Sequence, residues 1–346
     1  MRRILLVLLL IPLLLLPVQA EEISAPQVPE SGEALMPVPT ESFGNDLWQL
    51  FKKAVGTLEP ELKDAAGICL CLIATVMLAA ILRTAQGNIG KATEFACVVA
   101  VCTLLLGTTN SLIQTGADTV WELSQYGKLL LPVMTAMLAT QGGIGTSAGL
   151  YSGTALFDAV LSGLIAKLLI PLIYLYLVLA VGEHTTAEES LKRIKGFVKW
   201  LITWSLKTIL YVFTGYIGLT GVISGSADAA ALKATKLTIS GMVPVVGGIL
   251  SDASEAVIVG AQVMKSVAGI YGVLALLAIW IAPFLRIGAH YLLLKLTAAV
   301  CEAFGIKRAS GIIKDFSVAM GLLVGMTASV CIMFLVSTVC FMKGVA

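Results

Sequence analysis

Long apolar stretches restrict this chain to one kind of fold. They follow one another from residue 65 to residue 341 and contain few charged side chains. The stretches are 65–82, 95–113, 129–138, 150–165, 168–181, 200–224, 267–285, 287–304 and 318–341. A helix crosses a bilayer with about 20 mostly apolar residues, and it satisfies its own backbone hydrogen bonds in lipid. The sequence therefore predicts an all-α, polytopic integral membrane protein.

Composition supports this prediction. Hydrophobic residues make up 58% of the chain and charged residues only 13%, whereas soluble domains carry about 25% charged residues. A soluble core could not hide this much apolar surface, but a lipid bilayer can. The formal net charge of +2 is too small to predict nucleic-acid binding by bulk electrostatics.

Several of the apolar stretches are short or contain glycine. We therefore expect about seven to nine membrane-embedded segments, some of them broken or re-entrant. The stretch 129–138 is an example, because it runs directly into Gln141, Gly142 and Gly143.

The N-terminus has the pattern of a secretory signal peptide over residues 1–20. Arg2 and Arg3 precede an apolar run, and small residues at Val18 and Ala20 form a cleavage site. We expect cleavage after Ala20; the alternative is a retained first helix.

An extracytoplasmic segment is predicted over residues 21–60. Its first part is rich in Pro, Glu, Ser and Gly, which predicts an extended, mostly disordered tether. Apolar residues then recur at helical spacing from Leu47 to Leu58, which predicts a short amphipathic helix on the membrane surface or against a partner. The polytopic membrane domain would occupy residues 61–346.

Basic residues predict the orientation of the spans. The segment 183–199 ends in four closely spaced cations, namely Lys192, Arg193, Lys195 and Lys199. Such clusters mark cytoplasmic loops, and Arg83 with Lys91 places the turn after the first span on the same side. Lys307, Arg308 and Lys314 also favour the cytoplasm, but the sequence leaves open which way the last helices run.

No motif predicts catalysis. The chain has no nucleotide-binding loop, no H-E-x-x-H motif and no paired His and Cys site. Its seven cysteines form no C-x-x-C pair and lie in or beside apolar runs, which is typical of packing residues. We expect no enzyme activity, no cofactor and no metal.

Glycines four residues apart predict close contacts between helices. Such pairs let helix backbones approach each other in lipid. The pairs are Gly149 with Gly153, Gly221 with Gly225, and Gly321 with Gly325.

The segment from Asp228 to Lys265 is apolar between polar residues and contains helix breakers at its midpoint. Pro244, Gly247 and Gly248 predict a break, and hence a hairpin of two half-helices. The arms carry the charged residues Lys233, Lys236, Asp252, Glu255 and Lys265. In a hairpin Lys236 would face Glu255, so that each charge offsets the desolvation of the other. The alternative is an amphipathic surface loop with solvated charges.

This central segment resembles the stage III sporulation protein AE family. The resemblance lies in Lys233-Ala234-Thr235-Lys236, in the run from Val243 to Gly248, in Ser251-Asp252-Ala253, and in Lys265 ahead of Gly269. The order of signal peptide, polar tether, spans and apolar C-terminus is also similar.

The resemblance implies a role within an assembly of endospore-forming bacteria. Proteins of this family belong to a secretion-like channel apparatus that sustains the forespore after engulfment. It implies a multi-pass protein of the mother-cell membrane around the forespore, with other membrane, ring and ATPase subunits as partners. A stand-alone secondary transporter, with broken helices around a substrate site, and a pure scaffold remain as alternatives.

Overall fold

The computed structural model describes residues 26–38, 42–85, 90–140, 144–186, 188–219 and 267–344. Within these ranges every regular element is a helix. Five of the helices are long and apolar enough to cross a membrane. The prediction of an all-α, polytopic membrane protein is therefore confirmed.

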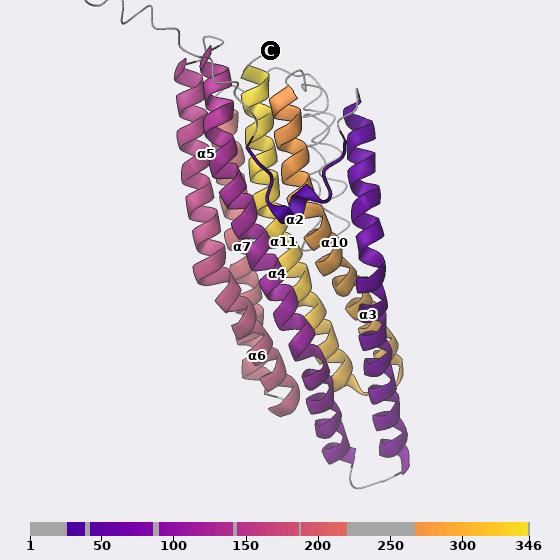
Figure 1. Cartoon of the computed structure of the whole chain (residues 1–346). Coiled ribbons are helices and arrows are strands. Elements are labelled where there is room, and N and C mark those ends of the chain that lie inside the picture. Colours follow the sequence, from indigo (N-terminus) through magenta and orange to yellow (C-terminus); the bar gives the residue numbers. More distant parts are fainter. Residues whose placement is uncertain are drawn as a thin grey trace, which may run out of the picture.

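Six long helical rods run up and down beside one another (Figure 1). They are α3 (Phe43–Ala85), α4 (Gly90–Thr140), α5 (Ile144–Leu164) continuing through a π-helix (Ile165–Leu169) into α6 (Ile170–Thr186), α7 (Glu189–Leu219), α10 (Val267–Ala303) and α11 (Lys307–Gly344), with the short α2 (Glu30–Glu33) before them. At about 1.5 Å per residue, the 51 residues of α4 extend far beyond the roughly 30 Å of a hydrocarbon core. The rods therefore project out of the membrane.

Helix α11 forms the axis of the bundle. It packs against α10, α4, α6, α5 and α7. In its most apolar stretch 94% of the residues are buried, against 28% in the corresponding stretch of α3. A helix that is apolar all round is expected inside a bundle, whereas α3 presents residues such as Leu70 and Ile81 to lipid.

Within the described residues, several of the expected segments combine into longer rods. Three pairs of expected spans are each one continuous rod: 95–113 joins 129–138 in α4, 150–165 joins 168–181 through the π-helix, and 267–285 joins 287–304 in α10. The residues between the two members of each pair do not end the helix, because its backbone hydrogen bonds are made within the helix itself. The break expected at Gln141–Gly143 lies outside the described residues. The expected segment 200–224 corresponds to α7, which is not among the five apolar spans.

Residues 26–38 pack on the bundle instead of extending as a tether. Val28 and Leu35 are buried, and a Cβ on Gly32 would lie 2.9 Å from the Ile279 side chain of α10. The expected amphipathic helix is the first part of α3, which buries Leu50 and Ala54. Apolar residues scattered through the proline-rich segment account for this docking.

The turns that carry basic residues lie at one end of the bundle (Figure 1). The C-terminal ends of α3, α6 and α10 and the N-terminal ends of α4, α7 and α11 lie there. Arg83, at the end of α3, donates a hydrogen bond from Nη1 to the carbonyl oxygen of Gly305 at 3.2 Å. Gly305 has a φ of 78°, which favours glycine in this turn. The α10–α11 turn therefore lies on the same side as the two earlier basic turns.

This arrangement predicts that the basic end faces the cytoplasm. In a cysteine-free background, Ser190→Cys on α7 and Ala303→Cys on α10 should resist an impermeant thiol reagent in intact cells. Glu59→Cys, on the exposed first half of α3, should react. Both protected positions should react once the cells are permeabilised. Labelling of Ala303→Cys alone from outside would contradict the shared position of the turns.

Candidate functional site

The predicted central hairpin lies outside the described residues. This applies to Lys233, Lys236, Pro244, Gly247, Gly248, Asp252, Glu255 and Lys265, and also to the glycine pair Gly221 and Gly225. The break and the pairing of Lys236 with Glu255 stay predictions.

In each of the other two glycine pairs, one member lies at a close contact between helices. A Cβ on Gly153 of α5 would lie 2.2 Å from the Tyr216 ring of α7, so only glycine fits there. One turn earlier, a Cβ on Gly149 would meet nothing within 4 Å, although its carbonyl oxygen accepts a hydrogen bond from the Tyr216 hydroxyl at 2.7 Å. In the second pair, Gly321 of α11 brings the backbone close to the Tyr291 ring of α10, since a Cβ added there would lie 3.1 Å from that ring. The carbonyl oxygen of Gly325 accepts a hydrogen bond from Ser329 within α11.

A cluster of buried charges lies near the basic end, and we call it the Lys195 cluster. Lys195 of α7 has only 9% of its surface exposed. Its Nζ lies 2.5 Å from a carboxylate oxygen of Glu183 on α6 and 2.5 Å from Oδ2 of Asp315 on α11. One ammonium group thus joins three helices.

Two further side chains complete the coordination of Asp315. The Tyr176 hydroxyl donates a hydrogen bond to Oδ1 at 2.8 Å, and His184 Nε2 lies 2.9 Å from Oδ2. Gly311, one turn before Asp315, makes room for the imidazole: a Cβ there would lie 2.4 Å from His184 Cε1. Both oxygens of the Asp315 carboxylate are therefore bonded.

The same residues raise the question of a metal site. Glu183, His184 and Asp315 place one possible ligand atom each within 4.8 Å of one another. Such a set suits a divalent cation. However, the Lys195 ammonium contacts both carboxylates at 2.5 Å and so takes the place of a cation. The geometry supports an ion-pair cluster.

Sequence reasoning missed this cluster. It treated 183–199 as a solvated loop, whereas the segment forms the end of α6 and the start of α7, with Lys195 buried. It also did not single out Asp315. The available signal was an acidic residue beside Ile312, Ile313 and Phe316 in an apolar helix, because a buried carboxylate needs a partner.

A second polar contact joins α4 and α5. Asp158, which is buried, accepts a hydrogen bond on Oδ2 from the Ser124 hydroxyl at 2.9 Å. Its Oδ1 makes no hydrogen bond to any described residue. One turn earlier on α5, the hydroxyl of Thr154 lies 2.9 Å from the hydroxyl of Ser337 on α11. These contacts tie the peripheral helices to one another and to the axis.

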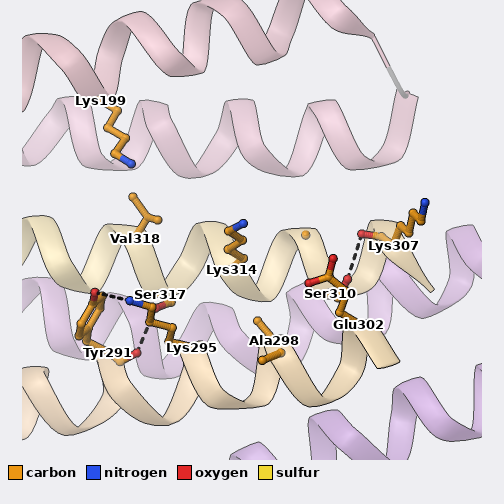
Figure 2. A pocket seen from close by; sticks show the side chains of 12 residues that line it. Lys199, Tyr291, Lys295, Ala298, Glu302, Lys307, Ser310, Lys314, Ser317 and Val318 are labelled. Atoms are coloured by element: carbon orange, nitrogen blue, oxygen red, sulfur yellow. Dashed lines mark hydrogen bonds between the residues drawn. The ribbon is translucent and has the colours of Figure 1, made fainter. Parts of the chain in front are cut away.

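A basic cavity of about 560 Å³ adjoins the Lys195 cluster. Side chains from α7, α10 and α11 line it (Figure 2). Gly311, which contacts His184 of the cluster, also lines it. Its lining residues are Lys199, Tyr291, Lys295, Ala298, Ala299, Glu302, Lys307, Ser310, Gly311, Lys314, Ser317 and Val318. Four lysines therefore share the cavity with one glutamate.

A family model described as stage III sporulation protein AE matches residues 33–344. The chain belongs to this family. The match includes every described helix from α3 to α11 and both groups of polar residues at the basic end. It confirms the resemblance drawn from the central segment, and it gives the chain a role in sporulation.

A curated relative agrees with the family. The chain is 25% identical to stage III sporulation protein AE of Bacillus subtilis (strain 168) over 221 residues, which cover 64% of this chain and 55% of the relative. The chain thus aligns with about half the length of that relative. No solved structure matches.

Removing the ammonium group should strongly destabilise the bundle. Lys195→Met leaves two carboxylates buried without a cation, and breaking a buried pair in this way costs about 3–5 kcal/mol. Thermal unfolding of the purified protein in detergent should show a large fall in Tm. Lys192→Met, at an exposed position of the same helix, is the matched control and should change the stability by less than about 0.5 kcal/mol.

A double variant tests the coupling within the cluster. Lys195→Met combined with Asp315→Asn should recover part of the lost stability, because one uncompensated charge is removed. If Lys195→Met is as mild as Lys192→Met, the ammonium is not the centre of the cluster.

The pair of glycines on α5 should respond in opposite ways to alanine. Gly153→Ala places a methyl group against the Tyr216 ring and should destabilise the α5–α7 contact by about 1–3 kcal/mol. Gly149→Ala meets open space and should be neutral or stabilising by up to about 1 kcal/mol, because alanine favours the helix. The same unfolding assay compares the two variants; equal effects would refute the close contact at Gly153.

Proposed function

We propose that this chain is a membrane subunit of the secretion-like channel apparatus between mother cell and forespore, needed for forespore development after engulfment. It would lie in the mother-cell membrane that surrounds the forespore. Its partners would be the other membrane, ring and ATPase subunits of that complex. Membership of the stage III sporulation protein AE family is the observation that carries the proposal.

The packing of the bundle supports a subunit role. Helix α11 fills the axis, and nearly all of its side chains are buried among the surrounding helices. A stand-alone secondary transporter, the alternative, needs a substrate site near the bilayer midplane between half-helices. In the described part of the chain, packed apolar side chains of α11, such as Leu323 and Met326, fill the centre of the bundle. Any conduit to which this chain contributes would then lie between subunits.

The chemistry of the described side chains supports a non-enzymatic role. The most polar buried group, the Lys195 cluster, has its charges paired with one another. A catalytic acid, base or nucleophile must reach a substrate, whereas these groups reach each other. The cluster therefore acts as a structural tie between α6, α7 and α11.

Affinity purification from sporulating cells tests the proposal. The tagged full-length chain should bring the ATPase and ring subunits with it, above the level found with an unrelated tagged polytopic protein. Cells without the chain should complete engulfment and then lose forespore gene expression. Lys192→Met should behave as wild type, which controls for the effect of substitution.

Two results would overturn the proposal. In the first, the chain purifies without these subunits and catalyses substrate uptake alone in liposomes, which would establish the transporter alternative. In the second, cells without the chain form spores normally.

A further inference from the structure

The basic cavity has the form of a groove between two helices. Helix α11 packs against both α10 and α7, while α7 and α10 scarcely touch each other. Helix α11 therefore forms the floor and the other two form the walls. Figure 2 shows Lys199 pointing from α7 toward α11, with Tyr291 and Lys295 on the opposite wall.

Most of the positive charge in the groove is not neutralised by acidic side chains among the described residues. Lys199, Lys295, Lys307 and Lys314 line it together with a single acid, Glu302. None of the four lysines forms an ion pair with a carboxylate in the described part of the chain. Nearby Lys195 differs, because it has two carboxylate partners.

The remaining polar groups are already engaged with the protein. The Ser317 hydroxyl donates to the carbonyl oxygen of Tyr291 at 3.0 Å, and the Ser310 hydroxyl donates to that of Lys307 at 3.2 Å. Lys295 donates to the hydroxyl of Tyr291 at 3.2 Å and lies 5.4 Å from the centre of that ring, but neither contact pairs its charge with a carboxylate. The lysine ammonium groups are thus the available recognition elements, and they suit an anion with several oxygen acceptors, such as phosphate.

The surroundings of the groove favour a lipid as the source of that phosphate. Leu292 and Leu296 on α10 are each 63% exposed, and they lie beside Tyr291 and Lys295 in the sequence. On α7, Phe197 and Trp200 are exposed and stacked on each other. Apolar and aromatic side chains next to basic ones are typical of the membrane interface. A headgroup could therefore enter the groove while its acyl chains stay against the apolar residues.

We propose that this groove binds the phosphate of an anionic phospholipid in the cytoplasmic leaflet. Basic pockets between transmembrane helices on that side bind such headgroups. The bound lipid would neutralise the four lysines and bridge α7 to α10, two helices that make few direct contacts with each other. The proposal does not depend on the channel function.

Thermal unfolding of the purified full-length protein in detergent tests it. Added phosphatidylglycerol or cardiolipin should raise the Tm in a concentration-dependent way, because a ligand that binds the folded state stabilises it. Phosphatidylcholine and inorganic phosphate at the same concentrations should not. An equal rise with inorganic phosphate would show a site for soluble phosphate and overturn the assignment to lipid.

Paired variants separate the groove from general surface charge. Lys295→Gln with Lys314→Gln should weaken the apparent affinity for anionic lipid about fivefold for each lysine removed, since each contributes about 1 kcal/mol. Lys192→Gln with Arg193→Gln removes the same charge from an exposed face of α7 outside the groove and should keep the wild-type affinity. Equal weakening by both pairs would overturn the proposal.

A variant that binds anionic lipid more tightly cannot be explained by misfolding. Glu302→Gln removes the acid from the groove and should tighten the binding of anionic lipid, without a matching change for phosphatidylcholine. A variant that merely folds poorly would not bind more tightly. If Glu302→Gln does not bind anionic lipid more tightly, and Lys295→Gln with Lys314→Gln binds it as the wild type does, the lipid binds outside the groove.

Discussion

The burial of α11 is the constraint on which the rest of the structure depends. In lipid the hydrophobic effect does not drive helices together, so association relies on close packing and on polar contacts. The bundle uses both. Gly153, Gly311 and Gly321 allow neighbouring helices or rings to approach closely, while Thr154 and Asp315 form polar contacts that join α5, α6 and α7 to the axis.

The Lys195 cluster adds directionality to this packing. Apolar side chains tolerate many rotations of one helix against another, but one ammonium group between two carboxylates permits few. Burying these charges has a desolvation cost that the pairing offsets, so the cluster contributes specificity of arrangement more than net stability. The cluster holds α6, α7 and α11 together at the end of the bundle where the proposed lipid groove lies. It thereby positions α7, the helix that carries Lys199 into the groove.

The sequence predicted the class of fold and the family, because apolar length and the central segment carry that information locally. It did not predict how the stretches combine. Polar residues between 113 and 129 suggested two separate segments, yet these residues form the middle of α4. A helix can include them because its backbone hydrogen bonds are made within the helix, whether lipid or water surrounds it. The sequence did not predict the ion pair of Lys195 with Asp315, because two residues 120 positions apart produce no periodic pattern. The acidic residue within an apolar helix was the available indication that Asp315 has a buried partner.

The position of the axial helix in the chain has a consequence for assembly. Proteins are synthesised from the N-terminus, and α11 follows every other described helix. Before α11 is synthesised, the helices that will contact it can contact only lipid or each other on their inner faces. These helices are α4, α5, α6, α7 and α10. Lys195 and Glu183 are synthesised before Asp315, so their ion pair lacks its third member until α11 inserts. The contacts of α11 with the other helices therefore form only after those helices have been synthesised.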